Sequence, residues 1–370
     1  MFKKLFYSLI KKAFALREIK STEIGRPKNI LVVRQHNQLG DLLACVPLFR
    51  ALKETFPGSR VTVIVSPQNF AAITKNKFID EYFVFDKRKI YRPGYFTRFR
   101  KLLRRQYDLA VVPVTVSISF TSNIMARLSN SKVRVGVREL NGMSNPYGFL
   151  FDRRVSMDWN RHPDQNVSEF CLDMLRPFGI STNNYSSEIT FDSADAANAS
   201  EFIQSNGLKA KELLIGLHVG AGKPPNRWPL MKFAELIERL NNSYSTRFFL
   251  TGSSADMEEI DYLKKYVTVK PALFFNRTIP EVAAMISEAD LFITNDTGIM
   301  HVAGTTPTPQ VSIFGPTNPY NWAPVGSNKI FIRKSDIIDD ISVDEVYTLC
   351  EKALMEKAIT GKKQVSELKR

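Results

Sequence analysis

The chain has 370 residues, of which 44% are hydrophobic, and it carries a formal net charge of +14. This length predicts two domains of ordinary size, and the composition excludes a disordered, collagen-like or disulfide-stapled protein. The excess of positive charge indicates an anionic partner, and nucleic acid, an anionic membrane surface and a phosphorylated substrate are all candidates.

Cysteine and histidine usage argues against cross-links and metal. Cys45, Cys171 and Cys350 are far apart in the sequence and odd in number, so we expect buried, reduced thiols in a reducing compartment. The four histidines never fall at the spacing of zinc ligands, so we expect no metal. No apolar run approaches the roughly 18 residues that span a bilayer, and Lys11-Lys12 interrupts the short apolar core of the N-terminus. We therefore expect a cytoplasmic protein.

Residues 2–14 have the periodicity of a basic amphipathic helix. One face holds Phe2, Leu5, Phe6, Leu9 and Ala13, and the opposite face holds Lys4, Ser8 and Lys11. Such a helix either lies on an anionic membrane or packs against the protein body. Residues 21–28 are polar, with Gly25 and Pro27, and are typical of a linker.

The chain from residue 29 alternates between short apolar runs and helical patterns. Strands are predicted over 29–34, 61–65, 109–116 and 133–137, and a helix over about 41–56. A second alternating series begins near residue 211. Its strands are predicted over 213–219, 247–250, 291–294 and 310–314, and its helices over 230–240, 255–265, 280–288 and from His301 onward. Alternation of this kind indicates doubly wound α/β sheets, so we expect two Rossmann-like lobes with a cleft between them.

Residues 87–105 carry nine Lys or Arg and no acid, interleaved with Tyr91, Tyr95, Phe96 and Phe99. A basic and aromatic segment can bind nucleic acid, lipid headgroups or a phosphorylated glycolipid. The same composition also suits a solvated loop and helix face, so the segment alone does not choose among these functions.

Two turns follow predicted strands and carry candidate site residues. The first is Leu39-Gly40-Asp41, at the edge of the sheet where α/β proteins bind ligands; Asp41 either faces that crevice or caps the next helix. The second, Gly220-Ala221-Gly222, can point backbone N–H groups at phosphate, and the nearby Arg227 can pair with a diphosphate. It is not a Walker A loop, because the required first glycine and the required Ser or Thr are absent.

The third turn is Asn295-Asp296-Thr297-Gly298-Ile299-Met300-His301, between a strand and a helix. The N–H groups of Thr297 and Gly298 would favour an anion there, although capping of the helix explains the same residues. Asp256 and the F-G-P-T segment at 314–317 end strands on the same edge, and Asp256 can accept hydrogen bonds from ribose hydroxyls.

Taken together, these motifs resemble glycosyltransferase family 9, the bacterial lipopolysaccharide heptosyltransferases. The N-terminal signature is similar at residues 30–34, 39–41, 47, 51–53 and 56–57. The C-terminal signature is similar at residues 227–229, 233–236, 295–298, 301–303, 309 and 314–317. The similarity runs from about residue 28 to 330, and the D-T-G-x-x-H block followed by F-G-P-T is its specific part.

The resemblance implies a GT-B fold, in which two Rossmann-like domains face a central cleft. It divides the chain into an N-terminal segment and linker (1–27), an acceptor domain (28–190), a nucleotide-sugar domain (191–358) and a basic tail (359–370). It implies inverting, metal-independent transfer of a sugar from ADP-heptose to a lipopolysaccharide core or lipid A-linked acceptor, with no cofactor. Asp41 falls on the general base. The donor-binding positions are Gly220, Ala221, Gly222, Arg227, Asp256, Asp296, Thr297, Gly298 and His301.

The remaining expectations concern acceptor, membrane and donor identity. The residues expected to contact the anionic glycolipid or the cytoplasmic face of the inner membrane are Gly40, Lys87, Arg88, Arg92, Arg98, Arg100 and Lys101. Nucleic acid is not the expected partner, because it leaves the D-T-G-x-x-H block unexplained. The family often has a lysine where this chain has Asn226, and Arg227 is the candidate to replace its charge. Another nucleotide sugar, or nucleotide binding without transfer, therefore stays open.

Overall fold

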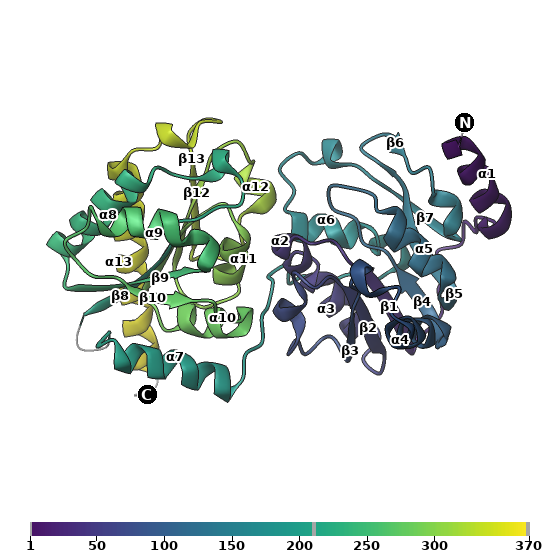
Figure 1. Ribbon diagram of the computed structural model, residues 1–370, viewed down its shortest axis with the longest axis horizontal. Coiled ribbons are helices and arrows are strands. Elements are labelled where there is room, and N and C mark those ends of the chain that lie inside the picture. The colour runs from purple at the N-terminus through teal and green to yellow at the C-terminus, as the bar shows by residue number, and fades with distance from the viewer. Residues whose placement is uncertain (1, 209–211, 368–370) are drawn as a thin grey trace. The chain divides into compact units, whose positions relative to one another are not determined.

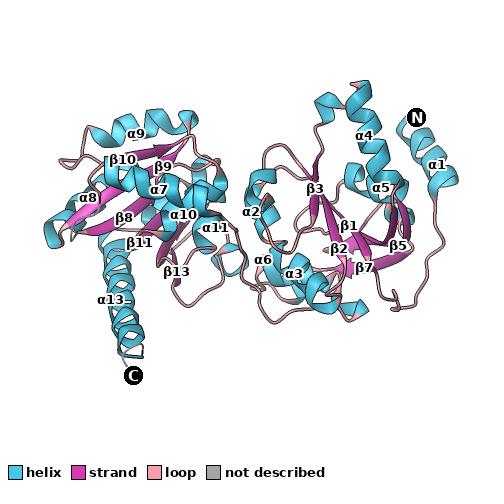
Figure 2. Cartoon of the chain, turned by 90° about the horizontal axis from the view of Figure 1, so that it is seen from below, coloured by secondary structure: helices cyan, strands magenta, loops and turns pink. Residues whose placement is uncertain are grey.

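The computed structural model describes the backbone of residues 2–208 and 212–367 and the side chains of residues 7–208 and 212–359. The chain divides into two compact units, Met1–Tyr185 and Ser186–Arg370. The boundary expected from the sequence, between residues 190 and 191, lies five residues further along the chain. Each unit contains one largely parallel sheet with helices packed on it (Figures 1 and 2).

The sheet of the first unit has the strand order β3-β2-β1-β4-β5-β6, with β7 also paired to β5. Its strands are β1 (Asn29–Arg34), β2 (Arg60–Val65), β3 (Glu81–Val84), β4 (Gln106–Val111), β5 (Asn130–Leu140), β6 (Met143–Ser144) and β7 (Arg153–Met157). All pairs are parallel except β5 with β6. The order reverses between β1 and β4, which is where α/β sheets place their ligands.

The α-helices of this unit are α1 (Phe2–Phe14), α2 (Leu39–Leu43), α3 (Val46–Thr55), α4 (Pro93–Arg104), α5 (Phe120–Leu128) and α6 (Val167–Asp173). Short 3₁₀ turns are η1 (Phe70–Ile73), η2 (Lys87–Lys89), η3 (Gly148–Leu150), η4 (Trp159–Arg161) and η5 (Arg176–Phe178). The single helix expected over 41–56 is wrong, because α2 and α3 are separate. Pro47 stands in the first turn of α3, where its missing N–H costs nothing, so a new helix begins there.

Helix α4 shows why the basic segment 87–105 carries aromatic residues. Phe99, Leu102 and Leu103 are buried in the core that joins α4 and α5 to one face of the sheet, and the buried Tyr95 ring contacts Phe83 at the margin of this core. Tyr91 and Phe96 are exposed. Half of the aromatic side chains in this segment are thus core residues, and the basic side chains occupy the outer face.

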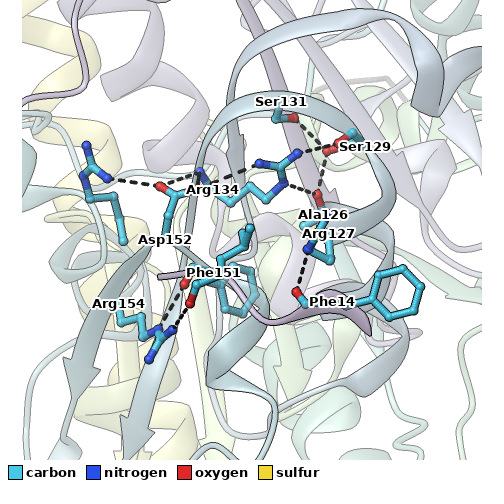
Figure 3. A network of polar contacts seen from close by, with 11 residues as sticks. Phe14, Ala126, Arg127, Ser129, Ser131, Arg134, Phe151, Asp152 and Arg154 are labelled. Carbon is cyan, nitrogen blue, oxygen red and sulfur yellow. Dashed lines mark hydrogen bonds and ion pairs between the residues drawn. The ribbon is translucent and has the colours of Figure 1, made fainter. Parts of the chain in front are cut away.

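Helix α1 packs against the first unit through one of its faces. The Tyr7 ring meets Phe149 edge to face, and Arg127 donates a hydrogen bond to the Phe14 carbonyl oxygen. In Figure 3 this bond belongs to a larger network, in which Arg134 donates to the carbonyl oxygens of Ala126 and Ser129. Leu9 and Ala13, on the expected apolar face, remain exposed, while the side chains of residues 2–6 lie outside the described ones.

The second unit is an all-parallel sheet of order β10-β9-β8-β11-β12-β13. Its strands are β8 (Leu213–His218), β9 (Thr246–Gly252), β10 (Ala272–Phe275), β11 (Leu291–Asn295), β12 (Gln310–Phe314) and β13 (Lys329–Arg333). Its α-helices are α7 (Ser193–Ser205), α8 (Leu230–Ser243), α9 (Met257–Lys264), α10 (Ile279–Ser287), α11 (Gly298–Gly304), α12 (Pro319–Trp322) and α13 (Val343–Glu367), and its 3₁₀ turns are η6 (Pro224–Asn226), η7 (Ser254–Asp256) and η8 (Ile338–Asp340). Strand order reverses between β8 and β11.

Helices α8, α9 and α13 share one hydrophobic core with the sheet of the second unit. The residues expected as a basic tail from 359 continue α13 as far as Glu367, and residues 368–370 lie outside the described ones. Within the described backbone, no helix is both long and apolar enough to cross a lipid bilayer.

Candidate functional site

Asp41 stands in the first turn of α2, directly after β1, and its side chain is buried. Helix α2 begins at Leu39 after Gln38, so Asp41 does not occupy the N-cap position. Its carboxylate instead forms an ion pair with Arg34, at 3.3 Å between Oδ2 and Nη2, and accepts a hydrogen bond from Thr115 Oγ1 at 3.2 Å. Arg34 ends β1 and Thr115 follows β4, so the switch point of the sheet holds the carboxylate.

Arg34 is the centre of a buried polar cluster around Asp41, with only 1% of its side chain exposed. Its Nη2 also donates to Thr115 Oγ1 at 3.1 Å, and its Nη1 contacts His36 Nδ1. Burial, with the charges of Arg34 and Lys87, lowers the pKa of His36 to about 4, so His36 is neutral at pH 7 and accepts this hydrogen bond. The guanidinium therefore fixes the direction of three side chains at once.

Two cysteines that are far apart in the sequence meet beside this cluster. The sulfur atoms of Cys45 and Cys171 lie 3.5 Å apart and both thiols are free and buried. Their shared hydrogen bond lowers the pKa of Cys45 and raises the pKa of Cys171, and the Arg34 charge favours the same thiolate at Cys45. The expected reduced thiols are present, and the pair joins the start of α3 to α6.

In the second unit, Asn295 holds together the turns that the sequence singled out. This fully buried residue ends β11, and its Nδ2 donates to the Val219 carbonyl oxygen at 2.8 Å. Its Oδ1 accepts the backbone N–H of Trp228 at 3.1 Å. The glycine-rich turn after β8 and the Asp296–His301 segment after β11 consequently form one continuous surface at the switch point.

Asp296 is partly exposed and is held by side chains from two neighbouring turns. Asn226 Nδ2 donates to its Oδ2 at 2.8 Å, and the Thr317 hydroxyl donates to the same carboxyl group. Burial raises the pKa of Asp296, while the Thr317 hydrogen bond and the charge of Lys223 limit that rise. The position where the family often has lysine is thus occupied by an amide that binds Asp296.

The glycine-rich turn is closely packed at Gly220 and open at Gly222. A Cβ atom at Gly220 would lie 2.5 Å from Asp256 Oδ1, so a side chain there would collide with this carboxylate. A Cβ atom at Gly222 would meet nothing within 4 Å. Asp256 Oδ2 accepts hydrogen bonds from Ser253 in a capping box, which leaves Oδ1 directed at the turn.

The remaining predicted donor residues begin the short helix α11 or brace the turn. Thr297, Gly298 and His301 are partly exposed at the edge of the sheet. Burial lowers the pKa of His301 to about 4, and its ring meets Trp322 edge to face. Arg227 is exposed; its Nε donates to the Ala221 carbonyl oxygen at 2.7 Å and its Nη1 pairs with Glu259 at 2.8 Å.

The expected acceptor and membrane residues lie in the first unit. Gly40 is in α2 beside Asp41, while Lys87 and Arg88 are in η2 and the rest surround α4. Arg88 is paired with Asp86. Among the described residues, the other basic side chains of this group have no ion pair: Lys87, Arg92, Arg98, Arg100 and Lys101.

A separate cavity of about 540 Å³ lies between β7 and α6. Its lining includes Arg176, which is paired with Glu169 and Asp173, so much of its charge is already neutralised. None of the predicted site residues lines it. Among the side chains that the structure describes, no three His, Cys, Asp or Glu residues gather as a metal site would require.

Two Rossmann-like domains, with a glycine-rich turn and an acid-containing turn at the switch point of the second, are the architecture of the GT-B class, to which many glycosyltransferases belong. The sequence agrees with this class. The model of the family described as "Glycosyltransferase family 9 (heptosyltransferase)" matches residues 96–346, and the chain belongs to that family.

Similar proteins cover most of the chain at low identity. Lipopolysaccharide heptosyltransferase 3 of Escherichia coli is 23% identical over 79% of this chain and 85% of its own length. A family 9 glycosyltransferase structure from Veillonella parvula gives a TM-score of 0.77 at 20% identity, covering 92% of this chain and all of that one. The structure of E. coli ADP-heptose lps heptosyltransferase II gives 0.72 at 19%, covering 89% and 99%. The structural similarities establish the fold.

Sequence reasoning singled out candidate site residues on these turns but did not identify the side chains that support them. Asn295 opened the segment expected to hold the donor, without a role of its own, and neither Arg34 nor Thr115 was predicted to have a role. Arg34 and Asn295 share a signal that could have found them, because each is a polar residue at the end of a buried strand, which is costly unless it has partners.

Proposed function

We propose that this glycosyltransferase is inverting and metal-independent, and that it transfers heptose from ADP-heptose to a lipopolysaccharide core or lipid A-linked acceptor. The observation that carries the proposal is the double hydrogen bond of Asn295, which joins the glycine-rich turn to the D-T-G-x-x-H segment. The backbone N–H groups and small residues of these turns suit the phosphates of a nucleotide sugar. The names of the relatives supply the donor and acceptor: one is an ADP-heptose enzyme and both E. coli proteins act on lipopolysaccharide.

In the proposed reaction Asp41 is the general base. The acceptor hydroxyl attacks the anomeric carbon of the donor from the face opposite ADP, and the bond from that carbon to the diphosphate oxygen breaks. Asp41 takes the hydroxyl proton during this attack, so a single displacement inverts the anomeric centre. Arg34 and Thr115 each use one carboxylate oxygen of Asp41, which leaves each oxygen with a further lone pair for the incoming hydroxyl.

The leaving ADP gains negative charge, which the donor domain must stabilise without a metal. The backbone N–H groups of Gly220, Ala221 and Gly222 and the N–H groups of Thr297 and Gly298 are the proposed donors to phosphate. Asp256 is proposed to bind the ribose and His301, as a neutral ring, the sugar or the phosphate. Arg227, the other residue proposed from the sequence, binds the Ala221 carbonyl oxygen and Glu259.

A transfer assay across a panel of ADP-, UDP-, GDP- and CMP-linked sugars tests this function. With a heptose-deficient lipopolysaccharide acceptor, we expect transfer from ADP-heptose, an inverted anomeric centre by NMR, and full activity in EDTA. If the enzyme transfers sugar only from another nucleotide sugar, the proposed ADP-heptose donor is wrong. Tight ADP binding without any transfer would favour the alternative of a nucleotide-binding homologue.

We also propose that the protein works on the cytoplasmic face of the bacterial inner membrane. Helices α4 and α5 pack on the same core of the first unit, and Arg127 of α5 donates to the Phe14 carbonyl oxygen at the end of α1. Helices α1 and α4 and the turn before α4 carry exposed Leu9, Tyr91 and Phe96 together with exposed basic residues. Exposed apolar side chains within a positive surface suit an anionic lipid leaflet.

Vesicle binding tests the membrane proposal. Replacing Lys3, Lys4, Lys11 and Lys12 by Gln should weaken binding to phosphatidylglycerol vesicles, and replacing Arg98, Arg100 and Lys101 should weaken it further. Lys264→Gln with Lys265→Gln, in the second unit, controls for lost charge. Binding that is equal for all these variants would contradict the proposal.

A further inference from the structure

The turn between β8 and α8 carries two cations that could face the donor diphosphate. They are Lys223 and Arg227, which lie on either side of Asn226 around η6. Because Asn226 is neutral, the positive charge of this turn comes from one or both of these residues.

Arg227 is already committed to the protein. Its Nε donates to the Ala221 carbonyl oxygen at 2.7 Å, and its Nη1 pairs with Glu259 at 2.8 Å. The first contact holds the glycine-rich turn in place. In the second, Glu259 of α9 neutralises the charge of the guanidinium. A diphosphate would have to compete with Glu259 for this charge.

Asn226 is neutral, and its side chain is also committed. It is 6% exposed, and its Nδ2 donates to both the carboxylate and the carbonyl oxygen of Asp296. Its role is to join η6 to the segment after β11. It has no charge to offer to a phosphate.

Lys223 is the remaining cation, and it is free. Its backbone carbonyl accepts the Asn226 N–H at 3.0 Å, which fixes Lys223 at the start of η6, one residue after the open position Gly222. The side chain is exposed and has no ion pair or side-chain hydrogen bond among the described residues. Asn226, which this backbone hydrogen bond joins to Lys223, donates to the Asp296 carboxylate, so Lys223 belongs to the turn that contacts the D-T-G segment. Burial raises the pKa of Asp296, and the Lys223 charge limits that rise.

We propose that Lys223 supplies the positive charge for the donor diphosphate in this chain, while Arg227 braces the turn. The inference rests on the proposed function, because it assumes that the surface around Asn295 binds a nucleoside diphosphate. An exposed ammonium beside a backbone turn suits the growing charge on the leaving group, since lysine acts as a mobile point charge that needs no fixed bidentate geometry.

Calorimetry with ADP and adenosine tests Lys223 directly, because only ADP carries the diphosphate. Lys223→Met should weaken ADP binding by about 10- to 100-fold, as loss of a hydrogen bond to a charged group does, and should change adenosine binding less than about twofold. Lys223→Arg should retain most of the ADP affinity. Lys265→Met removes an exposed lysine of the same domain and should leave both affinities unchanged.

The variant Arg227→Met tests the alternative that Arg227 supplies the charge for the diphosphate. We expect it to lower the unfolding temperature and to preserve the ratio of ADP to adenosine affinity better than Lys223→Met does. If Arg227→Met abolishes that ratio and Lys223→Met leaves it intact, the assignment is overturned. Thermal unfolding of each variant confirms that the proteins compared are folded.

Failure of the donor assignment can be separated from failure of this inference. If the wild-type protein prefers UDP or GDP to ADP, the proposed ADP-sugar donor is wrong, and Lys223→Met should then weaken the preferred diphosphate by the same factor relative to its nucleoside. If wild-type ADP binding is tight and Lys223→Met does not weaken it, the proposed donor is supported and the proposed role of Lys223 is wrong.

Discussion

The two domains share a sheet topology but use its switch point in different ways. In the first, a buried arginine and a threonine hold one carboxylate, so the site is built from charged side chains with fixed directions. In the second, a neutral amide, Asn295, holds backbone turns, and the surface they offer is made of N–H groups and small residues. A domain that must orient one proton acceptor needs side chains held in fixed directions. A domain that must surround phosphates needs backbone N–H groups that can approach the phosphate oxygens closely.

The largest effect should come from removing the charge behind Asp41. Arg34→Met leaves the Asp41 carboxylate buried without its ion-pair partner, and we expect the free energy of unfolding to fall by about 3–5 kcal/mol. Urea denaturation followed by circular dichroism measures the change. Arg247→Met, which breaks the exposed pair with Glu212 in the second domain, should cost less than about 1 kcal/mol. Equal losses in the two variants would contradict the contrast drawn between the domains.

Asp41→Asn should separate the chemical role of the first domain from the binding role of the second. The amide keeps the shape of the side chain but cannot take the acceptor proton, so turnover should fall roughly 10²-fold or more while donor affinity stays nearly constant. Asp296→Asn should instead weaken donor binding. Steady-state kinetics with the true donor distinguishes the two, and near-normal turnover of Asp41→Asn would leave Asp41 a structural residue only.

Packing behind the donor surface should be less tolerant than the surface itself. Gly216 lies inside β8, and a Cβ atom there would be 2.3 Å from Phe249 and 2.7 Å from Phe292. We expect Gly216→Ala to cost about 1–3 kcal/mol of unfolding free energy through overpacking. Gly222→Ala, in the open part of the turn, is the matched control and should change stability by less than about 1 kcal/mol. Thermal unfolding of both variants tests the difference.

The same contrast explains how much of this protein was predictable. Strands β1, β8, β11 and β12 were predicted because each is a buried, largely apolar run in the interior of a parallel sheet. Strands β3, β10 and β13 were missed, because each lies at a sheet edge, where partial exposure removes the apolar signal.

The turns that carry the candidate site residues could be recognised in the sequence, but the partners of those residues could not. Asp41 and Thr115 are 74 residues apart, and Cys45 and Cys171 are 126 apart. No local pattern relates such pairs, because only the strand order brings their segments together. The structure also shows that Arg227 binds Glu259, which depends on the position of α9 and could not be read from the turn alone.

The smallest effect at neutral pH should come from His301. Burial lowers the pKa of His301 from 6.5 to about 4, so between these values the unfolded chain binds a proton that the folded domain does not. Stability should therefore fall as the pH drops from 6.5 toward 4, with a slope of at most about 1.4 kcal/mol per pH unit from this group. His301→Gln should flatten that part of the curve and have little effect on stability at pH 7. His36 has the same lowered pKa in the first domain, so His36→Gln should flatten the transition of that domain instead. Denaturation curves at pH 7, 6 and 5 measure the slopes, and an unchanged slope in both variants would show that neither ring is kept neutral by its surroundings.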